Sequence, residues 1–184
     1  MPATYLSTVP AAVRERATRI RLLALDVDGT LTDGRLRLAS DGTEIKAFNA
    51  LDGQGLKLLH ESGIEVALIT ARNSAIVAQR AAELGIEHVY QGCHEKLASL
   101  RALCQILSLE AEQVAYMGDD LPDLSALGWV GLAVAPSNAH PWVAQRVHWI
   151  TSKAGGAGAA RELCDLIVDA QGKSAQLLRK YTDA

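Results

Sequence analysis

The sequence predicts an α/β protein, a Rossmann-like three-layer sandwich with a central parallel sheet and a small β-hairpin extension after the first strand. Short apolar runs alternate with segments whose apolar residues recur every three or four positions, which is the order of a strand–helix repeat. Hydrophobic residues make up 49% of the chain and aromatic residues only 4%, so aliphatic side chains must build the core. The length of 184 residues suits one domain, and we expect residues 1–184 to form it.

Five apolar runs predict the strands of the central sheet. Residues 21–26 read RLLALD, a short apolar run stopped by acidic and glycine residues, as expected for a buried parallel strand that ends at a functional loop. The remaining runs lie at residues 65–69, around Val89, at 114–118 and at 131–135. Segments with helical patterns separate these runs, so we expect a strand followed by a helix to be the repeating unit.

Two segments show the apolar spacing of a helix that buries one face. Apolar side chains recur at three- and four-residue intervals in both of them. The positions are Leu97, Leu100, Leu103, Cys104 and Leu107 in the first segment, and Leu163, Leu166, Ile167 and Ala170 in the second. Both helices are therefore expected to cover the central sheet.

One stretch after the first strand breaks the strand–helix pattern. Residues 36–39 and 44–48 flank a cluster of Ser, Asp, Gly and Thr that is typical of a hairpin turn, which predicts a small flap over about residues 34–50. An extension at this point rises from the carboxyl end of the sheet, where open α/β proteins place their ligands. A glycine-rich loop at 153–158 precedes the expected last helix, and residues 173–184 read as a polar, mobile tail with no clear packing face.

The DVDGT motif at the end of the first predicted strand places Asp26 and Asp28 two residues apart on a tight loop. Like charges this close raise each other's proton affinity unless a cation neutralises them, so the spacing suits a Mg²⁺ site with one carboxyl group left as an acid or base. DG pairs are also common turn formers, and an isolated DxDG can belong to a calcium loop. A calcium loop continues with further oxygen ligands, whereas Leu31 follows Thr30, which favours the magnesium hypothesis.

Later strand ends carry further candidates, each with an ordinary structural explanation. Thr70 ends the second predicted strand, where its hydroxyl can bind phosphate, but threonine there is often only a helix cap. Lys96 lies at the start of a helix, where most lysines are solvated. The GDDLPD motif crowds Asp119, Asp120 and Asp123 after the fourth strand, and capping accounts for one of the three. Together the motifs predict a nucleophile, phosphate donors and a metal-binding cluster at one sheet edge.

These four motifs, in this order, resemble those of the haloacid dehalogenase superfamily of phosphohydrolases. The resemblance covers nearly the whole chain and, with no large insertion beyond the hairpin, indicates the capless subgroup. It implies a phosphatase in which Asp26 attacks phosphorus and forms an aspartyl-phosphate, while Asp28 donates a proton to the departing oxygen. Thr70 and Lys96 are then the residues that hold the transferring phosphoryl group.

The same resemblance implies a Mg²⁺ cofactor and a set of residues around it. The implied ligands are the carboxylate of Asp26, the main-chain carbonyl of Asp28 and the carboxylate of Asp119. Asp123 and Asp120 are implied to support Lys96 and the water molecules around the metal as an outer layer of contacts.

A closer resemblance is to the 3-deoxy-D-manno-octulosonate 8-phosphate phosphatase family of lipopolysaccharide biosynthesis, through the segments DVDGTLTDG, DGTEIKAFNALDGQG and KAGGAGAARELCDLI. It implies a sugar-phosphate substrate and a homotetramer in which hairpins form a central barrel and Arg72 or Arg80 reaches a neighbour's substrate. The implied substrate contacts are Asp28, Asn49, Asp52, Gly53, Lys57, Arg72, Arg80 and Lys96. Leu51, Ala71 and Ala157 depart from the family pattern of arginine, glycine and arginine, and a phosphatase for another keto-acid sugar, such as a nonulosonate 9-phosphate, is the alternative.

Composition and charge argue against other classes of function. The formal net charge of −3, with no basic block, disfavours a nucleic-acid partner, and no segment approaches the ~20 apolar residues that cross a bilayer. Three widely spaced cysteines fit reduced thiols in the cytoplasm. Two non-catalytic alternatives are a phosphoacceptor signalling module, whose acidic motifs come in another order, and a scaffold that has lost its activity.

Overall fold

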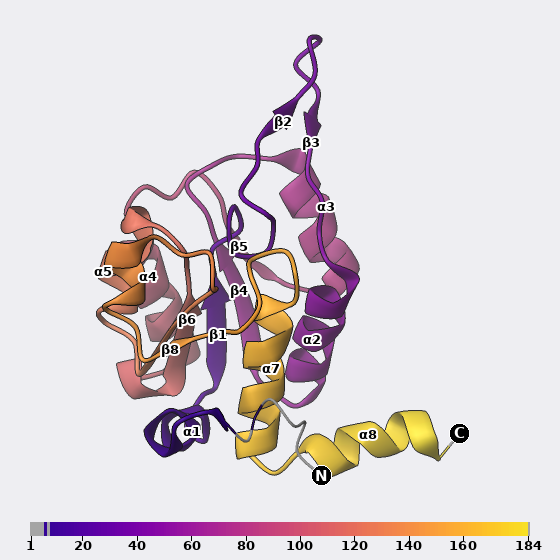
Figure 1. The fold of residues 1–184 in the computed structure, drawn as a ribbon, viewed down its shortest axis with the longest axis vertical. Helices are drawn as coiled ribbons and strands as arrows, with labels where there is room; N and C mark the ends of the chain where they lie inside the picture. Colours follow the sequence, from indigo (N-terminus) through magenta and orange to yellow (C-terminus); the bar gives the residue numbers. More distant parts are fainter. Residues whose placement is uncertain (1–5, 7, 184) are drawn as a thin grey trace.

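The computed structural model describes residues 6 and 8–183, and a six-stranded parallel sheet lies at its centre (Figure 1). The strands are β1 (Leu22–Leu25), β4 (Glu65–Ile69), β5 (His88–Tyr90), β6 (Val114–Met117), β7 (Leu132–Ala135) and β8 (Trp149–Ile150). Their order across the sheet is β5-β4-β1-β6-β7-β8, and every neighbouring pair is parallel. This arrangement confirms the predicted α/β class and its central parallel sheet.

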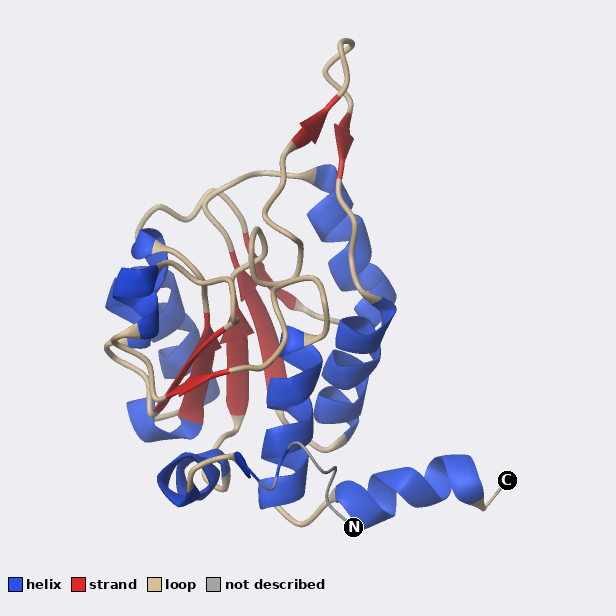
Figure 2. Cartoon of the chain, viewed as in Figure 1, coloured by secondary structure: helices blue, strands red, loops and turns tan. Residues whose placement is uncertain are grey.

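Helices cover both faces of the sheet, which makes the three layers visible in Figure 2. The first face is covered by α1 (Ala11–Ala17), α2 (Ala50–Glu61), α3 (Ala75–Leu84) and α7 (Ala159–Ala170), and the second by α4 (Lys96–Leu107), α5 (Leu124–Leu127) and α6 (Pro141–Ala144). In β1 the side chain of Leu23 packs into the first layer and that of Leu22 into the second. Because both faces are buried, the strands read as continuous apolar runs rather than as alternating patterns.

The predicted hairpin is present and extends beyond the body of the molecule (Figure 1). Its strands β2 (Arg37–Leu38) and β3 (Glu44–Ile45) pair antiparallel, with Leu38 opposite Glu44. Leu36, Leu38 and Ile45 are exposed on it. The hairpin therefore presents apolar surface to solvent beside the edge of the sheet where the strands end.

The polar tail expected at residues 173–184 differs from the structure, in which 174–182 form the helix α8 (Ser174–Thr182). Leu177 is buried against the main core, and Lys180 forms a 2.8 Å ion pair with Glu61 of α2. The expectation that this segment lacks a packing face is thus wrong. Leu177, Leu178 and Tyr181 recur at helical spacing in this segment, so the sequence did carry a signal for this helix.

Three short elements also escape the sequence patterns. The edge strand β8 has only two residues, and it joins the sheet by pairing Trp149 with Val134 of β7. Two 3₁₀ turns, η2 (Ala111–Gln113) and η3 (Leu121–Asp123), flank β6. Within the described part of the chain, none of the helices combines the length and the apolar character needed to span a membrane.

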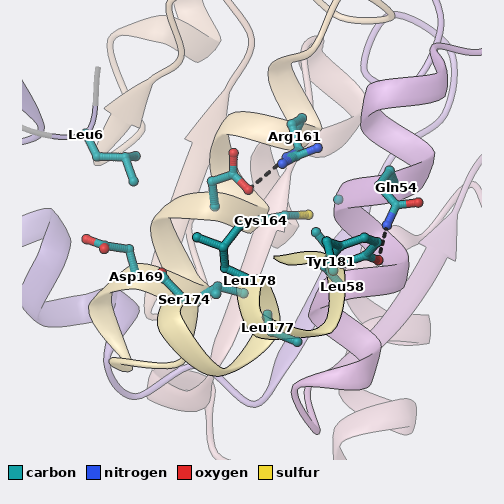
Figure 3. Close-up of a pocket in the computed structure, with 13 residues that line it drawn as sticks. Leu6, Gln54, Leu58, Arg161, Cys164, Asp169, Ser174, Leu177, Leu178 and Tyr181 are labelled. Carbon is teal, nitrogen blue, oxygen red and sulfur yellow. Dashed lines mark hydrogen bonds and ion pairs between the residues drawn. The ribbon is translucent and has the colours of Figure 1, made fainter. Parts of the chain in front are cut away.

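A cavity of about 430 Å³ lies between α2, α7 and α8, at the end of the molecule away from the hairpin (Figures 1 and 3). Leu58, Cys164 and Leu177 are among its lining residues. The acidic residues of the strand ends do not line it. The chemistry that the sequence predicts must therefore be sought at the opposite end, where the parallel strands terminate.

Candidate active site

The carboxyl ends of three adjacent strands bring the predicted residues to one edge of the sheet. Asp26 follows β1, Thr70 follows β4 and Asp119 lies two residues after β6. Asp26 and Thr70 are both buried there. The Asp26 amide donates a hydrogen bond to the carbonyl of Met117 at 2.9 Å, which continues the pairing of β1 with β6 beyond the strand. The backbone of the sheet thus fixes where the first carboxylate lies.

Lys96, the first residue of α4, forms ion pairs with two acidic residues of this edge, Asp26 and Asp123. Its side chain is 3% exposed, and its Nζ lies 2.8 Å from Oδ1 of Asp26 and 2.7 Å from Oδ1 of Asp123. Burial alone lowers the pKa of Lys96, but the charges of Asp26 and Asp123 outweigh that effect and raise the pKa above its ordinary value. Lys96 is therefore a fixed cation at the carboxyl edge of the sheet.

Asp123 is held on all sides by hydrogen-bond donors. Its Oδ1 accepts from Lys96 and from the Tyr116 hydroxyl at 2.8 Å, and its Oδ2 accepts from the amides of Asp119 at 3.1 Å and Asp120 at 3.3 Å. Both carboxylate oxygens are thus engaged. Asp123 fixes the position of Lys96 and the start of the GDDLPD loop, rather than presenting a free oxygen.

Asp26 and Asp119 have fewer hydrogen-bond donors around their carboxylates than Asp123, and the pKa values of both are raised. Burial, reinforced by the charge of Asp123 and opposed by Lys96, raises the pKa of Asp26 from 3.8 to about 7. Burial and the same charge raise the pKa of Asp119 to about 6, although Thr30 donates a hydrogen bond to it at 3.1 Å. The protein alone does not balance the negative charge at this point.

The arrangement fits a divalent cation. Asp26, Asp119 and Asp123 each offer an oxygen within 4.8 Å of the others. Because the donors around Asp123 occupy its oxygens, Asp26 and Asp119 are the members of this group best placed to act as ligands, and that role stays a prediction. Carboxylate oxygens are ligands that hard cations such as Mg²⁺ or Ca²⁺ prefer. The third predicted ligand is the main-chain carbonyl of Asp28, and its role stays a prediction, because this group consists of side-chain oxygens.

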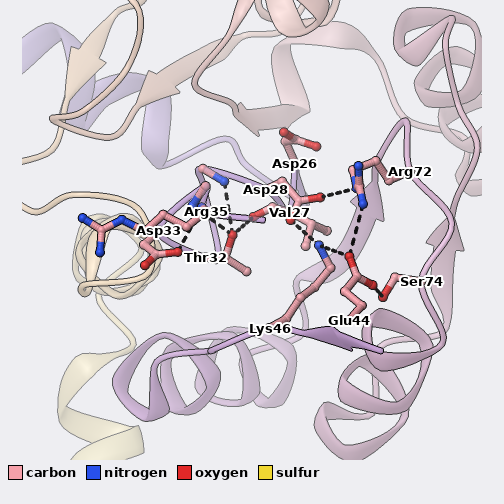
Figure 4. Close-up of polar contacts among 12 residues, drawn as sticks. Asp26, Val27, Asp28, Thr32, Asp33, Arg35, Glu44, Lys46, Arg72 and Ser74 are labelled. Carbon is pink, nitrogen blue, oxygen red and sulfur yellow. Dashed lines mark hydrogen bonds and ion pairs between the residues drawn. The ribbon is translucent and has the colours of Figure 1, made fainter. Parts of the chain in front are cut away.

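The Asp28 side chain instead lies in an outer layer of contacts at the base of the hairpin (Figure 4). Its Oδ1 forms an ion pair with Lys46, and its Oδ2 lies 3.7 Å from Nε of Arg72. Glu44 contacts both of these cations. Arg72, a predicted substrate contact, therefore lies beside Asp28 of its own chain.

Two of the predicted substrate contacts belong to the start of α2 and anchor the glycine-rich loop. Asn49 caps α2 by accepting from the Leu51 amide at 2.8 Å, and its Nδ2 donates to the Gly156 carbonyl at 3.3 Å. Asp52 is buried and accepts from the amides of Gly158 at 3.2 Å and Arg161 at 2.8 Å. These hydrogen bonds show that both side chains stabilise the start of α2 and the glycine-rich loop. Their contact with substrate stays a prediction.

The remaining predicted contacts lie around α2 and α3. The Arg80 guanidinium stacks over Phe48 at 5.9 Å and occupies the space that a Cβ on Gly53 would take. Gly53 therefore makes room for Arg80. Lys57 is exposed farther along α2, about 12 Å from Asn49 by the rise of the helix.

Asp120, predicted to support the metal site, is exposed and accepts a 2.8 Å hydrogen bond from the Leu121 amide, which caps η3. Its supporting role stays a prediction.

Sequence reasoning missed several polar residues at this edge. They are Thr30, Glu44, Lys46, Ser74, Tyr116 and Asn138. Glu44 opens β3 and Lys46 directly follows it, and a two-residue spacing in extended backbone places both side chains on one face, which was the available signal. Asn138 had no such signal. It donates to the Gly29 carbonyl at 3.2 Å and accepts from the Gly155 amide at 2.6 Å, so it joins the DVDGT loop to the glycine-rich loop.

The glycine-rich loop presses directly on the backbone of the DVDGT motif. A Cβ on Gly155 would overlap the carbonyl oxygen of Gly29, and the Gly156 amide donates to the Thr30 carbonyl at 3.1 Å. A side chain at position 155 is therefore incompatible with this close backbone approach.

Comparison with known proteins agrees with this geometry. The family model of haloacid dehalogenase-like hydrolases matches residues 86–163. The chain is 48% identical over 171 residues to the 3-deoxy-D-manno-octulosonate 8-phosphate phosphatase KdsC of Escherichia coli K12, which covers 93% of this chain and 91% of that protein. A crystal structure of a hypothetical protein from Xanthomonas campestris matches with a TM-score of 0.95 and 54% identity over 98% of this chain and 99% of that one.

A further solved structure is the 3-deoxy-D-manno-octulosonate 8-phosphate phosphatase of Moraxella catarrhalis, described in complex with a magnesium ion, a phosphate ion and a KDO molecule. It matches with a TM-score of 0.90 and 44% identity over 92% of this chain and 97% of that one. The fold and the acidic edge thus define a phosphatase, that is, a phosphoric monoester hydrolase. The chain belongs to the haloacid dehalogenase-like hydrolases and, among them, to the 3-deoxy-D-manno-octulosonate 8-phosphate phosphatase family.

Replacement of Gly155 by Ala tests the contact between the two loops. We expect phosphatase activity to fall about 100-fold, because the DVDGT backbone must move by a substantial fraction of an ångström. The free energy of unfolding should fall by only about 1–3 kcal/mol, the usual cost of overpacking. Steady-state kinetics and thermal unfolding measure the two effects.

The matched control is Gly128→Ala, which adds a methyl group where φ is −71° and where the new Cβ would lie 3.2 Å from the Leu124 carbonyl oxygen. Its activity should stay close to that of the wild type. Equal activities of the two variants would contradict the close-packing argument.

Proposed function

We propose that the protein hydrolyses 3-deoxy-D-manno-octulosonate 8-phosphate to the free sugar acid and inorganic phosphate, through an aspartyl-phosphate on Asp26 and with Mg²⁺ bound. The observation that carries this proposal is the position of Asp26, whose Oδ1 lies 2.8 Å from the buried Lys96 ammonium at the carboxyl edge of the sheet. The names of the relatives support the choice of substrate, and the proposed step belongs to lipopolysaccharide precursor biosynthesis.

In the first step a carboxylate oxygen of Asp26 attacks phosphorus, the bond to the sugar oxygen breaks, and Asp28 donates a proton to that oxygen. Asp28 must carry this proton when the substrate is bound. Lys96 offsets charge on the transferring phosphoryl group, which makes it a preorganised electrostatic contact. Thr70, buried at the end of β4, is proposed to hold a phosphoryl oxygen.

In the second step water attacks phosphorus of the aspartyl-phosphate and gives its proton to Asp28. The bond between the phosphoryl group and Asp26 breaks, which releases inorganic phosphate and regenerates both carboxyl groups in their starting states. Asp28 therefore serves as acid and then as base. The reaction is thereby divided into two displacements at phosphorus, with Asp26 as the nucleophile of the first and water as that of the second. Asp28 transfers the proton in both.

The residues proposed to hold Mg²⁺ are Asp26, Asp119 and the main-chain carbonyl of Asp28, with Asp123 and Asp120 around them. When bound, the ion offsets the repulsion between the phosphate and the anionic nucleophile and orients the phosphate. The raised pKa values of Asp26 and Asp119 support this assignment, because they indicate an uncompensated acidic cluster.

For the sugar we propose contacts from the positions that the family resemblance implies. They are Asp28, Asn49, Asp52, Gly53, Lys57, Arg72, Arg80 and Lys96. Arg72 is the best supported of the arginines, since it lies 3.7 Å from Asp28 and is 43% exposed. Leu51, Ala71 and Ala157 depart from the family pattern, so a nonulosonate 9-phosphate is the alternative substrate.

We further propose that the chain acts in the cytoplasm as a homotetramer of one-domain subunits joined through the hairpins. The exposed Leu36, Leu38 and Ile45 support association at this element, because a protruding ribbon with apolar surface favours burial. Sedimentation velocity of the wild type and of a Leu38→Lys variant tests it. A wild-type monomer would contradict the proposal.

The proposed function is tested by phosphate release from a panel of sugar phosphates, with and without Mg²⁺. We expect metal-dependent release with a strong preference for 3-deoxy-D-manno-octulosonate 8-phosphate. A preference for a nonulosonate 9-phosphate would move the substrate and retain the chemistry. No release from any phosphate monoester would favour a non-catalytic phosphoacceptor or scaffold.

Mg²⁺ affinity should depend on pH in a range set by the two uncompensated acids. With pKa values of about 7 for Asp26 and about 6 for Asp119, both groups are protonated at low pH and must lose protons to bind the ion. Affinity should therefore fall by at least about tenfold between about pH 8 and about pH 6. Calorimetric titration in two buffers of different ionisation enthalpy measures both affinity and proton release. Acids of ordinary pKa would leave the affinity unchanged over this range.

A further inference from the structure

Four charged side chains form a closed ring at the base of the hairpin, in the order Asp28, Lys46, Glu44, Arg72 (Figure 4). Lys46 pairs with Asp28 and lies 3.3 Å from Glu44, while Arg72 lies 3.3 Å from Glu44 and 3.7 Å from Asp28. Ser74 donates a hydrogen bond to Glu44 at 2.7 Å. We call these four residues the charge ring. Acidic and basic side chains alternate around it.

The charge ring ties together three separate segments. Asp28 belongs to the loop after β1, Glu44 and Lys46 to the base of the hairpin, and Arg72 to the loop between β4 and α3. The hairpin is thereby joined to the loop that carries the proposed nucleophile. The position of the hairpin and the orientation of the Asp28 side chain are therefore linked.

Lys46 is the most buried member of the charge ring. Its side chain is 3% exposed, against 18% for Asp28, 19% for Glu44 and 43% for Arg72. A buried ammonium group requires partners, and it makes their geometry well defined because moving away would leave it desolvated and unpaired. Lys46 thus restrains the Asp28 carboxylate more strongly than the exposed Arg72 does.

The two oxygens of Asp28 have different environments. Oδ1 is in close contact with Lys46, whereas the 3.7 Å separation between Oδ2 and Arg72 is longer than a hydrogen bond. Oδ2 is therefore the oxygen that can accept a new partner without breaking the buried contact.

We propose that Lys46 is a positioning residue for the proposed reaction: it fixes Asp28 through Oδ1, so that Oδ2 faces the departing sugar oxygen. This inference rests on the proposed function, because it assigns a task to the acid of that mechanism. Removing the ammonium group frees the Asp28 rotamer and leaves Arg72, the more exposed cation, as the remaining contact of the ring with both Asp28 and Glu44. The acid then spends less time in the geometry that transfers a proton.

The nature of the leaving group provides the test. A sugar alkoxide needs a proton as it departs, whereas nitrophenolate leaves without one. The ratio kcat/KM reports the steps up to the first irreversible one, which includes departure of the leaving group and excludes hydrolysis of the aspartyl-phosphate. Misplacing Asp28 should therefore lower kcat/KM for a sugar phosphate far more than for p-nitrophenyl phosphate.

The experiment compares kcat/KM of the full-length wild type, Lys46→Met, Lys46→Arg and Arg37→Met on the best sugar phosphate and on p-nitrophenyl phosphate. For Lys46→Met we expect a fall of about 100-fold on the sugar phosphate and of less than about threefold on the aryl phosphate. Lys46→Arg should recover most of the loss. Arg37→Met is the matched control, because Arg37 is a hairpin cation that pairs with Asp33 at 2.7 Å outside the charge ring.

Each outcome separates this inference from the function on which it rests. A wild type that hydrolyses neither substrate contradicts the proposed function itself. An active wild type with equal losses on both substrates in Lys46→Met, or with no loss on either, overturns the positioning role and leaves the proposed function intact. In single-turnover kinetics, an unchanged maximal rate with a higher half-saturating concentration of the sugar phosphate also overturns it, because that result indicates direct sugar binding by Lys46.

Discussion

Replacement of Asp26 by Asn should abolish phosphate release, with kcat falling by at least about 10⁴-fold. An amide is isosteric with the carboxylate but cannot act as the nucleophile, so the aspartyl-phosphate does not form. Acid quenching of a single turnover with radiolabelled substrate should give labelled wild-type protein and unlabelled variant. Turnover of the Asn variant close to that of the wild type would rule out Asp26 as the nucleophile.

The Asp26→Asn variant should remain folded, which makes the loss interpretable. Burial disfavours the charged form of Asp26, so a neutral amide removes that penalty, while Lys96 keeps its 2.7 Å ion pair with Asp123. We expect a thermal unfolding midpoint near pH 8 that is not lower than that of the wild type. Asp33→Asn is the matched control, because Asp33 lies on the same loop, pairs with Arg37 and is partly exposed.

Replacement of Lys96 by Met should lower kcat by about 10³-fold, since it removes a preorganised charge from a buried site. Met preserves most of the side-chain volume, so the variant isolates the ammonium group. The loss leaves Asp26 and Asp123 without the cation that lies between them. Steady-state kinetics on a sugar phosphate at saturating Mg²⁺ measures the effect.

The controls for Lys96 distinguish charge from geometry and from helix stability. Lys96→Arg keeps the charge but places a planar group in a space fitted to an ammonium, so it should restore only part of the activity. Arg101→Met changes a cation on the same helix, where Arg101 stacks over Trp129 at 5.5 Å, and its activity should match the wild type. Wild-type activity of Lys96→Met would remove Lys96 from the mechanism.

Unfolding measurements on Lys96→Met add an independent readout. Removing one partner of a buried ion pair typically costs about 3–5 kcal/mol, because the remaining charge stays desolvated. Two acids lose a partner here, so we expect destabilisation in the metal-free protein that added Mg²⁺ partly reverses. Unchanged stability without metal would contradict the burial and pairing of Lys96.

Several features of the candidate site follow from the local sequence, because the strand–helix repeat already predicts a parallel sheet and hence a common edge for the strand ends. Asp26, Thr70 and Asp119 each follow a short apolar run, and parallel strands end at a common edge, so these residues were expected to meet there. The structure brings Asp26 and Asp119 into one cluster and adds Lys96 at the start of α4. Spacing along the chain sufficed because each of these residues lies within six positions of the end of a parallel strand.

Contacts made by long side chains across separate segments did not follow from local sequence. Lys46 reaches Asp28 from the hairpin, and the Tyr116 hydroxyl reaches Asp123 from within β6. Asp52, expected to face the substrate, turns beneath the glycine-rich loop and accepts two backbone hydrogen bonds. Each depends on how two elements are oriented in space, and no short-range pattern encodes that orientation.

Local patterns in the sequence suffice for the α/β class, the hairpin after the first strand and the acids at the sheet edge, because apolar periodicity and strand-end placement are local properties. Three further features emerge only in three dimensions: β8 extends the sheet at one edge, Leu177 of α8 packs on the core, and the Asp28 carboxylate lies in the charge ring. These features depend on packing between segments that are distant in the chain, which no short-range pattern encodes.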